Sequence, residues 1–441
     1  MTLKEMRELA EEMIIEGIRS ADPEHLVKNN IDIDGQKIKI CGETFYRNDY
    51  EEIVLLGVGK ASLPMAKGCK KLDPDDGIVI TKSCRDIEKD TYPVKVKEAH
   101  HPYPEHANIE ATNELLSKVE GKENALFIFL VSGGGSALFT SPSKDITLSE
   151  IKDLNRLLIK SGADIHEINV VRKHVSRVKG GRFGNFCSQR GDIVSLIISD
   201  VVGDDLSVVA SGPTYPDDST YKDAEEILKE FDLWKKVSHS IREHIKKGIE
   251  GEVEETPTEL DVHNFLVGNN MVALQGAKKI VEEKNINNII LTSQNQGGAK
   301  VVAKPLMGIA KEIQDTSNPI GPPAVLILGG ETTVRLESTN EETGKGGPNR
   351  ELVLSSAIEI QGRKNIVIAS VDSDGTDGLG KAGAIADTST VERCEFDPKD
   401  NLERHDTQPY FESIGDSIEF DSRTNVNDIT VIIVEEKDEK K

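Results

Sequence analysis

The sequence has few cysteines, and their spacing suits neither a metal site nor a disulfide framework. The five cysteines are Cys41, Cys69, Cys84, Cys187 and Cys394. They are odd in number, widely spaced and include no CxxC pair, which argues against structural zinc and against a small disulfide-stapled fold. We therefore expect reduced thiols in a cytoplasmic protein.

Long apolar runs are also missing. The chain has no stretch of about 18 apolar residues, so it predicts no membrane span. Residues 1–20 mix Lys, Arg and Glu with apolar residues at helical spacing, unlike the apolar core of a signal peptide.

Basic charge is scarce relative to acidic charge. The formal net charge is -23, from 54 Lys and Arg against 77 Asp and Glu. Phosphate backbones and anionic membranes attract clustered Lys and Arg, so we expect no nucleic acid and no membrane as partner. An anionic small molecule stays open as a substrate where basic residues gather locally.

Short apolar strands alternate with helical patterns along the 441 residues, which predicts an α/β fold with a doubly wound sheet. The seven apolar residues 125–131 are typical of a parallel strand buried on both faces. The polar, acidic stretch 246–263 is interpreted as a linker. We predict two domains, 1–250 and 262–441, with the strand at 264–268 in the second.

Glycine-rich or acidic loops follow five of the predicted strands. In open α/β sheets ligands bind beyond the carboxyl ends of the strands, so these loops are expected to share one site. The first is GVGKAS at 57–62, with Gly59 and Lys60; the second is Ser132, Gly133, Gly134, Gly135 and Ser136. Both can place backbone N–H groups against an anion, although each could also be a plain turn.

A basic stripe and two acidic residues add candidate chemistry to the first domain. Offsets of 3, 4, 7 and 10 residues predict one helical face for a set of polar residues: Asn169, Arg172, Lys173, Ser176 and Lys179. Asp200 and Asp204 follow a strand, where carboxylates can hold Mg²⁺ or accept a proton from a hydroxyl group. Ser211 and Thr214 come shortly after them.

The second domain contributes further candidates on loops expected after its strands. The candidate residues there are Glu331, Thr332, Asn349, Asp374 and Asp377. The Asp-Gly string at 372–378 lacks the Glu of a calcium-binding EF-hand loop. The adjacent His100 and His101 form a second-rank candidate before a PxP turn.

Taken in order, these strings resemble the glycerate 2-kinase family, whose C-terminal part is called MOFRL. The matching strings are GVGKAS at 57–62, HPYPE at 101–105, SGGGSAL at 132–138, INVVRKHVSRVKGG at 168–181, SDVVGDD at 199–205, ASGPTYPD at 210–217 and GGETTV at 329–334. The resemblance implies a Rossmann-like N-terminal domain, a C-terminal α/β domain and an active site in the cleft between them. It also implies phosphorylation of D-glycerate to 2-phosphoglycerate with ATP and Mg²⁺, in a homodimer.

The resemblance implies that Lys60 holds the substrate or the transferred phosphate. Lys60, Arg172 and Asp200 are the predicted catalytic residues, and Asp200 and Asp204 the predicted metal ligands. The family usually reads GGRNQE where this chain has GGPNRE at 346–351, so Pro348 replaces an expected Arg. The family string DGPTDAAGA is one residue shorter here and lacks one Asp. Both departures leave the substrate open.

Three alternatives stay open on the sequence. The chain could be a kinase for another small hydroxy acid, or a ligand-binding protein without catalysis. It could also be an NAD(P)-dependent hydroxypyruvate reductase, because strand-then-glycine loops also suit dinucleotides. Against the reductase, the first loop has Ser62 in place of the third glycine of the fingerprint, and residues 77–84 lack an acidic ribose partner.

Overall fold

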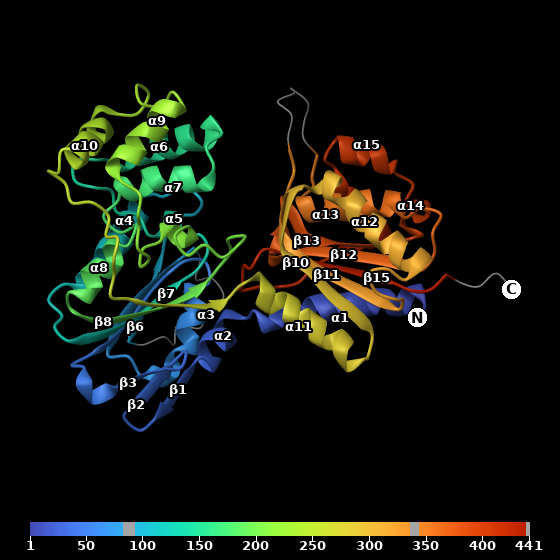
Figure 1. The fold of residues 1–441 in the computed structure, drawn as a ribbon, viewed down its shortest axis with the longest axis horizontal. Helices are drawn as coiled ribbons and strands as arrows, with labels where there is room; N and C mark the ends of the chain where they lie inside the picture. Colours follow the sequence, from blue (N-terminus) through green and yellow to red (C-terminus); the bar gives the residue numbers. More distant parts are fainter. Residues whose placement is uncertain (83–92, 336–343, 438–441) are drawn as a thin grey trace. The chain divides into compact units, whose positions relative to one another are not determined.

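The computed structural model describes residues 1–82, 93–335 and 344–437, so Cys84 lies outside the described residues. The chain divides into two compact units, one of Pro23–Gly268 and one of Met1–Asp22 with Asn269–Lys441 (Figure 1). In the described part of the chain, no helix is both long and apolar enough to span a membrane.

A six-stranded parallel sheet is the centre of the first unit. In chain order its strands are β4 (Ile53–Val58), β5 (Asp76–Thr81), β6 (Val94–Glu98), β7 (Ala125–Val131), β8 (Gly191–Ile198) and β9 (His263–Gly268). They lie in the order β6-β5-β4-β7-β8-β9. This is third, second, first, fourth, fifth, sixth, the order of the doubly wound fold. The predicted parallel sheet is confirmed, and its order reverses between β4 and β7.

The apolar strands form because both faces of this sheet are covered. Every residue of β7 is buried, as its unbroken apolar run predicts. Three helices pack on the sheet: α3 (Ser62–Gly68) on β4, β5 and β7, α4 (His106–Val119) on β5 and β6, and α8 (Arg182–Ser188) on β8.

Strand β9 belongs to the first unit, whereas the sequence placed it in the second domain. It pairs in parallel with β8, and the unit ends at Gly268. The acidic stretch before β9 is therefore a segment within the first unit, since backbone pairing to β8 carries the chain back into this sheet.

A helical group and a small antiparallel sheet complete the first unit. The helices are α2 (Pro23–Asn29), α5 (Gly135–Leu138), α6 (Leu148–Ser161), α7 (Ile165–His174), α9 (Tyr221–Glu230) and α10 (His239–Ile249). The three strands are β1 (Ile31–Asp34), β2 (Lys37–Ile40) and β3 (Glu43–Tyr46). Helices α6, α7, α9 and α10 share an apolar core that includes Leu158, Val171 and Leu228.

The second unit contains a mixed sheet. Its strands lie in the order β10 (Asn287–Gly298), β11 (Ala324–Thr333), β15 (Asp428–Val434), β12 (Ile366–Asp377), β13 (Gly380–Asp387) and β14 (Ser417–Ile418). Within the described residues of this second sheet, only the β10–β11 pair is parallel. Strands β11 and β12 continue through the residues 329–333 and 372–377, so the prediction that loops begin there is wrong.

Helices cover both faces of this second sheet. Figure 1 shows α1 (Leu3–Ser20) and α11 (Asn270–Glu283) on one side, and α12 (Ala299–Thr316) and α13 (Pro348–Glu359) on the other. Three short helices follow along the chain: α14 (Thr390–Arg393), α15 (Pro398–Glu403) and α16 (Thr407–Ile414). Residues 1–22, which the sequence reading assigned to the N-terminal domain, pack with the C-terminal region because α1 buries its apolar face against α11, β12 and β15.

Candidate functional site

The two glycine-rich loops of the first unit follow β4 and β7, the neighbouring strands where the sheet order reverses. They are bonded to each other: the backbone N–H of Lys60 donates to the Gly133 carbonyl at 2.9 Å, and that of Ala61 donates to Ser132 Oγ at 3.0 Å. This is the position at which doubly wound sheets bind ligands. The sequence therefore placed both loops correctly at one edge of the sheet.

The loop after β4 uses its own N–H groups inside the protein. The N–H of Gly59 donates to the Ile80 carbonyl at 3.1 Å, and that of Ser62 donates to the Gly59 carbonyl at 3.2 Å. With the bonds of Lys60 and Ala61, four successive N–H groups have protein acceptors. This loop offers a ligand the Lys60 side chain rather than a cradle of backbone donors.

The loop after β7 has a different arrangement. In the described chain, the N–H groups of Gly133 and Gly134 donate no hydrogen bond to the protein. A Cβ on Gly133 would lie 2.0 Å from Asp200 Oδ2, and Gly134 has a φ of +81° with His101 Nε2 3.2 Å from its Cβ position. The two glycines thus allow Asp200 and His101 to approach backbone donors that can bind an anion.

Asp200 follows β8, the neighbour of β7. Burial raises the pKa of the Asp200 carboxyl above its ordinary value, and the charge of Lys60 opposes this rise. A carboxylate held beside a cation and over a glycine is placed to accept a proton from a hydroxyl group. Asp204, the other predicted metal ligand, lies in the following turn with a φ of 58° and is partly buried.

Helix α7 positions three of the predicted residues. It begins where the Asp164 side chain accepts the N–H groups of His166 and Glu167. The Arg172 Nε donates to Asn155 Oδ1 at 2.7 Å, which fixes the guanidinium against α6. Lys173 Nζ lies 3.1 Å from Asp217 Oδ1 in a buried ion pair, so its charge is already matched.

The prediction of one helical face through Lys179 is wrong, because α7 ends at His174. Beyond the end of this helix, Lys179 nevertheless lies at the loop after β7, where its Nζ donates to the Ser136 carbonyl at 2.7 Å. Burial, with the nearby charge of Arg172, lowers the pKa of Lys179 to about 7. Lys179 therefore brings a cation to the loop after β7, near the charge of Arg172.

A chain of hydroxyl groups connects this loop to α7. Ser136 Oγ and Ser211 Oγ lie 2.9 Å apart, and Ser211 Oγ donates to Asn169 Oδ1 at 2.9 Å. The buried Asn169 Nδ2 makes no hydrogen bond with the described residues. Thr214 lies apart from this chain, since its hydroxyl donates to Ser195 and Asn264 on β8 and β9.

A pocket of about 270 Å³ lies beside the loop after β7. It is lined by Gly134, Ser136, Arg172, Lys179 and by His101, which sequence reasoning ranked second. Burial and the charges of Lys60 and Lys82 lower the pKa of His101 to about 4, so its ring is neutral near pH 7. The His-Pro-x-Pro string was the only sequence signal for this residue.

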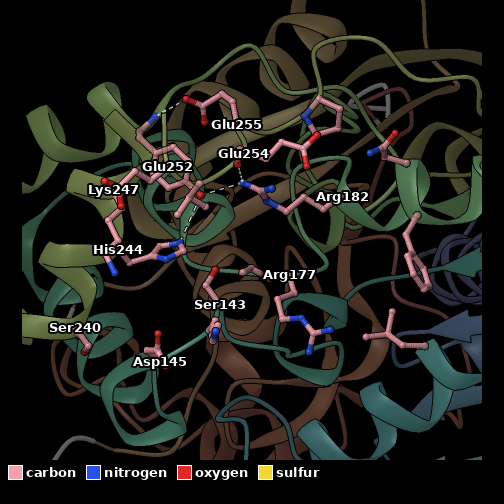
Figure 2. Close-up of a pocket in the computed structure, with 18 of the residues that line it drawn as sticks. Ser143, Asp145, Arg177, Arg182, Ser240, His244, Lys247, Glu252, Glu254 and Glu255 are labelled. Carbon is pink, nitrogen blue, oxygen red and sulfur yellow. Dashed lines mark hydrogen bonds between the residues drawn. The ribbon is translucent and has the colours of Figure 1, made fainter. Parts of the chain in front are cut away.

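A larger pocket, of about 650 Å³, lies between α8, α10 and the segment 252–257 (Figure 2). Arg182 Nη2 donates to the Tyr221 hydroxyl at 3.1 Å and to the Glu254 carbonyl at 2.9 Å. Figure 2 labels Arg182 and Glu254 on the wall of this pocket. Both acidic and basic side chains line it. Ser176 of the predicted basic stripe is among its lining residues, whereas the predicted catalytic residues Lys60, Arg172 and Asp200 are not.

In the second unit, several predicted residues stabilise the start of α13. Asp377 is buried, and its carboxylate accepts the N–H groups of Asn349 and Arg350 at 3.0 Å and Arg350 Nε at 3.1 Å. Pro348 is at the first turn of the helix, where a missing N–H is tolerated. Arg350 is fully buried against Asp377, so it does not offer the charge of the absent family Arg.

Sequence reasoning missed Asp428, the first residue of β15. It accepts hydrogen bonds from Asn349 Nδ2 at 2.6 Å and from the Thr332 N–H at 3.1 Å. Burial raises the pKa of Asp428 well above its ordinary value. An Asp directly before an apolar strand was its only signal. Glu331 is exposed, and Asp374 accepts bonds from Thr376 within its own turn.

In residues 1–82, 93–335 and 344–437, no group of three or more His, Cys, Asp or Glu side chains is arranged to hold a metal ion. Mg²⁺ in phosphoryl-transfer sites commonly takes one or two carboxylates together with phosphate oxygens. Asp200 and Asp204 therefore stay predicted ligands, and the predicted cleft between the domains also stays a prediction.

Comparison with known proteins finds two family models that match successive parts of the chain. A family model described as a domain of unknown function (DUF4147) matches residues 9–246, and the MOFRL family model matches residues 324–428. The chain is 38% identical to the glycerate 2-kinase of Pyrococcus horikoshii, with 99% of each chain covered. It is 34% identical to a putative hydroxypyruvate reductase of Agrobacterium vitis, covering 95% of this chain and 92% of the other.

A solved structure agrees over the whole length. The crystal structure of glycerate kinase from Thermotoga maritima superposes with a TM-score of 0.86 at 34% identity, covering 98% of this chain and 100% of that one. Family models and nearly full-length relatives agree with the motifs and the strand order. The chain therefore belongs to the glycerate 2-kinase family, with an N-terminal DUF4147 domain and a C-terminal MOFRL domain.

Proposed function

We propose that this protein transfers the γ-phosphoryl group of ATP to the 2-hydroxyl group of D-glycerate and forms 2-phosphoglycerate. One observation carries the proposal: among the described residues, the N–H groups of Gly133 and Gly134 have no protein acceptor, and they lie between Asp200 and a pocket with Arg172 and Lys179. Phosphoryl transfer depends mainly on positioning and on charge stabilisation, and this arrangement supplies both.

The transfer assigns each group a role. The Asp200 carboxylate accepts the proton of the 2-hydroxyl group as its oxygen forms a bond to the γ-phosphorus. The bond from that phosphorus to the bridging oxygen breaks, and ADP leaves with the electron pair. Lys60 and Arg172 offset the charge on the transferred group, while one of them holds the glycerate carboxylate. Lys173 acts through its ion pair with Asp217, which fixes α7.

Asp200 and Asp204 would hold Mg²⁺ in this proposal. Carboxylate oxygens suit a hard cation that shares its ligands with phosphate oxygens. When bound, the ion neutralises phosphate charge. The remaining assignments are also proposals: the binding residues Gly59, Asn169, Ser211, Thr214, Glu331, Thr332, Asn349, Asp374 and Asp377, the homodimer, and the cytoplasmic location.

A second candidate is an NAD(P)-dependent hydroxypyruvate reductase, since two relatives are named putative hydroxypyruvate reductases. The hydrogen bonds of the loop after β4 argue against the reductase function. A dinucleotide pyrophosphate is bound by the N–H groups at that turn, and here they donate to protein acceptors. Absorbance at 340 nm with NADH and hydroxypyruvate decides: oxidation of NADH would favour the reductase.

The experiment that tests the kinase is ADP release from the purified chain with ATP, Mg²⁺ and D-glycerate. We expect release that depends on glycerate, with 2-phosphoglycerate as the product. A panel of small hydroxy acids in the same assay separates glycerate from related substrates. If another acid gives the higher kcat/KM, the substrate assignment is overturned while the kinase assignment stands.

A further inference from the structure

The pocket beside the loop after β7 has two chemically different ends. Ser136, Arg172 and Lys179 form a polar, cationic end. A second part of the lining comes from α6 and from the segment 101–104, where His101, Lys152 and Asn155 stand among several apolar side chains; these are Pro102, Tyr103, Pro104, Ile151, Leu154 and Ile159. A ligand that fills the pocket must therefore join an anionic part to an apolar part.

Two large side chains of the apolar wall are open to solvent. Tyr103 and Ile159 are each 58% exposed although both line the pocket. Single exposed apolar residues are common on protein surfaces, but two on one pocket wall mark a surface that gains from contact with an apolar group. The wall is thus suited to a flat, weakly polar group.

Glycerate has no such group, because each of its three carbon atoms carries oxygen. A nucleoside triphosphate has both parts, a planar base and a chain of phosphates. The phosphates match the cationic end, where Arg172 is held by Asn155 of α6 at 2.7 Å. Since α6 also carries Ile159, one helix connects the two ends of the pocket.

We propose that the apolar end of this pocket binds the base of the phosphoryl donor, in contact with Tyr103 and Ile159. The phosphates then run toward Arg172, Lys179 and the loop after β7. This assignment rests on the proposed kinase function. The assignment also gives glycerate a separate position. Because the base fills the apolar end, glycerate must approach the loop on the side of Lys60 and Asp200.

The test compares Ile159→Asp with Ile249→Asp in the full chain. Ile249 ends α10, is 43% exposed and lines neither described pocket, so the control carries the same change of charge. Calorimetry measures the binding of ADP and of inorganic tripolyphosphate, which has no base. We expect Ile159→Asp to weaken ADP binding by about tenfold or more and tripolyphosphate binding by less than about twofold.

Ile159→Asn separates polarity from charge, and we expect it to weaken ADP binding by about threefold or more without affecting tripolyphosphate. Equal losses for ADP and tripolyphosphate, or unchanged ADP binding, would overturn the base site. In the activity assay, a raised KM for glycerate with an unchanged KM for ATP would also overturn it and leave the kinase standing. If the wild-type chain releases no ADP, the proposed kinase function is rejected. The calorimetric comparison of ADP with tripolyphosphate would still show whether the base binds at this wall.

Discussion

The two glycine-rich loops at the centre of the first sheet are alike in sequence but differ in what their backbones do. The loop at 57–62 donates its N–H groups to protein acceptors, whereas Gly133 and Gly134 keep theirs free in the described chain. Both follow buried parallel strands, and both have glycines where backbones approach closely. Glycine content therefore marks close packing, and only the hydrogen-bond partners show which loop can bind an anion.

The strongest test of this comparison concerns the carboxylate over the second loop. Asp200→Asn should lower kcat by about 1000-fold, because an amide does not accept the proton of the substrate hydroxyl group. Burial disfavours the charged form of Asp200, so the neutral amide should leave the melting temperature unchanged or raise it. Steady-state ADP release and thermal unfolding measure both effects.

Asp204→Asn is the matched variant in the neighbouring turn. A loss of activity there that additional Mg²⁺ restores would indicate a metal ligand rather than a base. If Asp200→Asn keeps the wild-type kcat, Asp200 is not the proton acceptor.

The next largest effect should come from the loop itself. Gly133→Ala places a methyl group where Asp200 Oδ2 now lies, 2.0 Å from the new Cβ. We expect kcat/KM to fall by about 100-fold, since a displaced catalytic group loses its alignment. Gly308→Ala on α12 meets no atom within 4 Å and serves as the control.

The control variant Gly308→Ala should keep full activity. Its free energy of unfolding should rise by about 0.5–1 kcal/mol, because glycine in a helix loses more conformational freedom on folding than alanine does. Full activity in Gly133→Ala would mean that the loop moves without consequence, and the proposed contact with Asp200 would lose its role.

Lys179 gives the second loop a dependence on pH that the first loop lacks. Its pKa is lowered to about 7, so the ammonium form dominates below pH 7 and the neutral amine above it. Anion binding should therefore weaken as pH rises, and the KM for ATP should increase by about tenfold between pH 7 and 8.5. Initial rates from pH 6 to 9 measure this.

Lys179→Arg is the control, because a guanidinium stays charged throughout this range. It should flatten the profile of KM against pH. A wild-type profile that is already flat would show that Lys179 does not bind the anion as an ammonium.

The smallest expected effect is on the free energy of unfolding, and it should differ between the two loops. The Ser62 hydroxyl donates to the Gly59 and Ile80 carbonyls at 2.9 and 3.0 Å. Ser62→Ala should lower the free energy of unfolding by about 1–2 kcal/mol and leave kcat unchanged. Ser136→Ala in the second loop should do the reverse, with lower activity and little change in denaturant unfolding; identical behaviour of the two variants would contradict the comparison.

Several features of the fold could be predicted because they are local. The apolar run of β7 and the helical period of α1 need no partner to be recognised. Partners could not be predicted: α1 packs with the C-terminal region, and β9 pairs with β8. An amphipathic helix or a short strand shows which face is apolar, but not which of several apolar surfaces covers it.

The candidate site was predicted in part for the same reason. Lys60, Asp200, Arg172 and the loop after β7 were named from the sequence, whereas His101 was undervalued and Asp428 missed. Arg350 and Asp377 make a contact that the sequence does not predict, since the two charged side chains are buried against each other at the start of α13.

The sequence by itself determined the α/β class, the main buried strands, the family motifs and the glycines that permit close approach. The tertiary structure decided which glycine loop is free to bind an anion, and it brought Lys179 back to Arg172 after the helix had ended. The physical reason is that the acceptors of the first loop are the Ile80 carbonyl, the Gly133 carbonyl and Ser132 Oγ. They come from β5 and from the loop after β7, and their positions exist only once the sheet has formed.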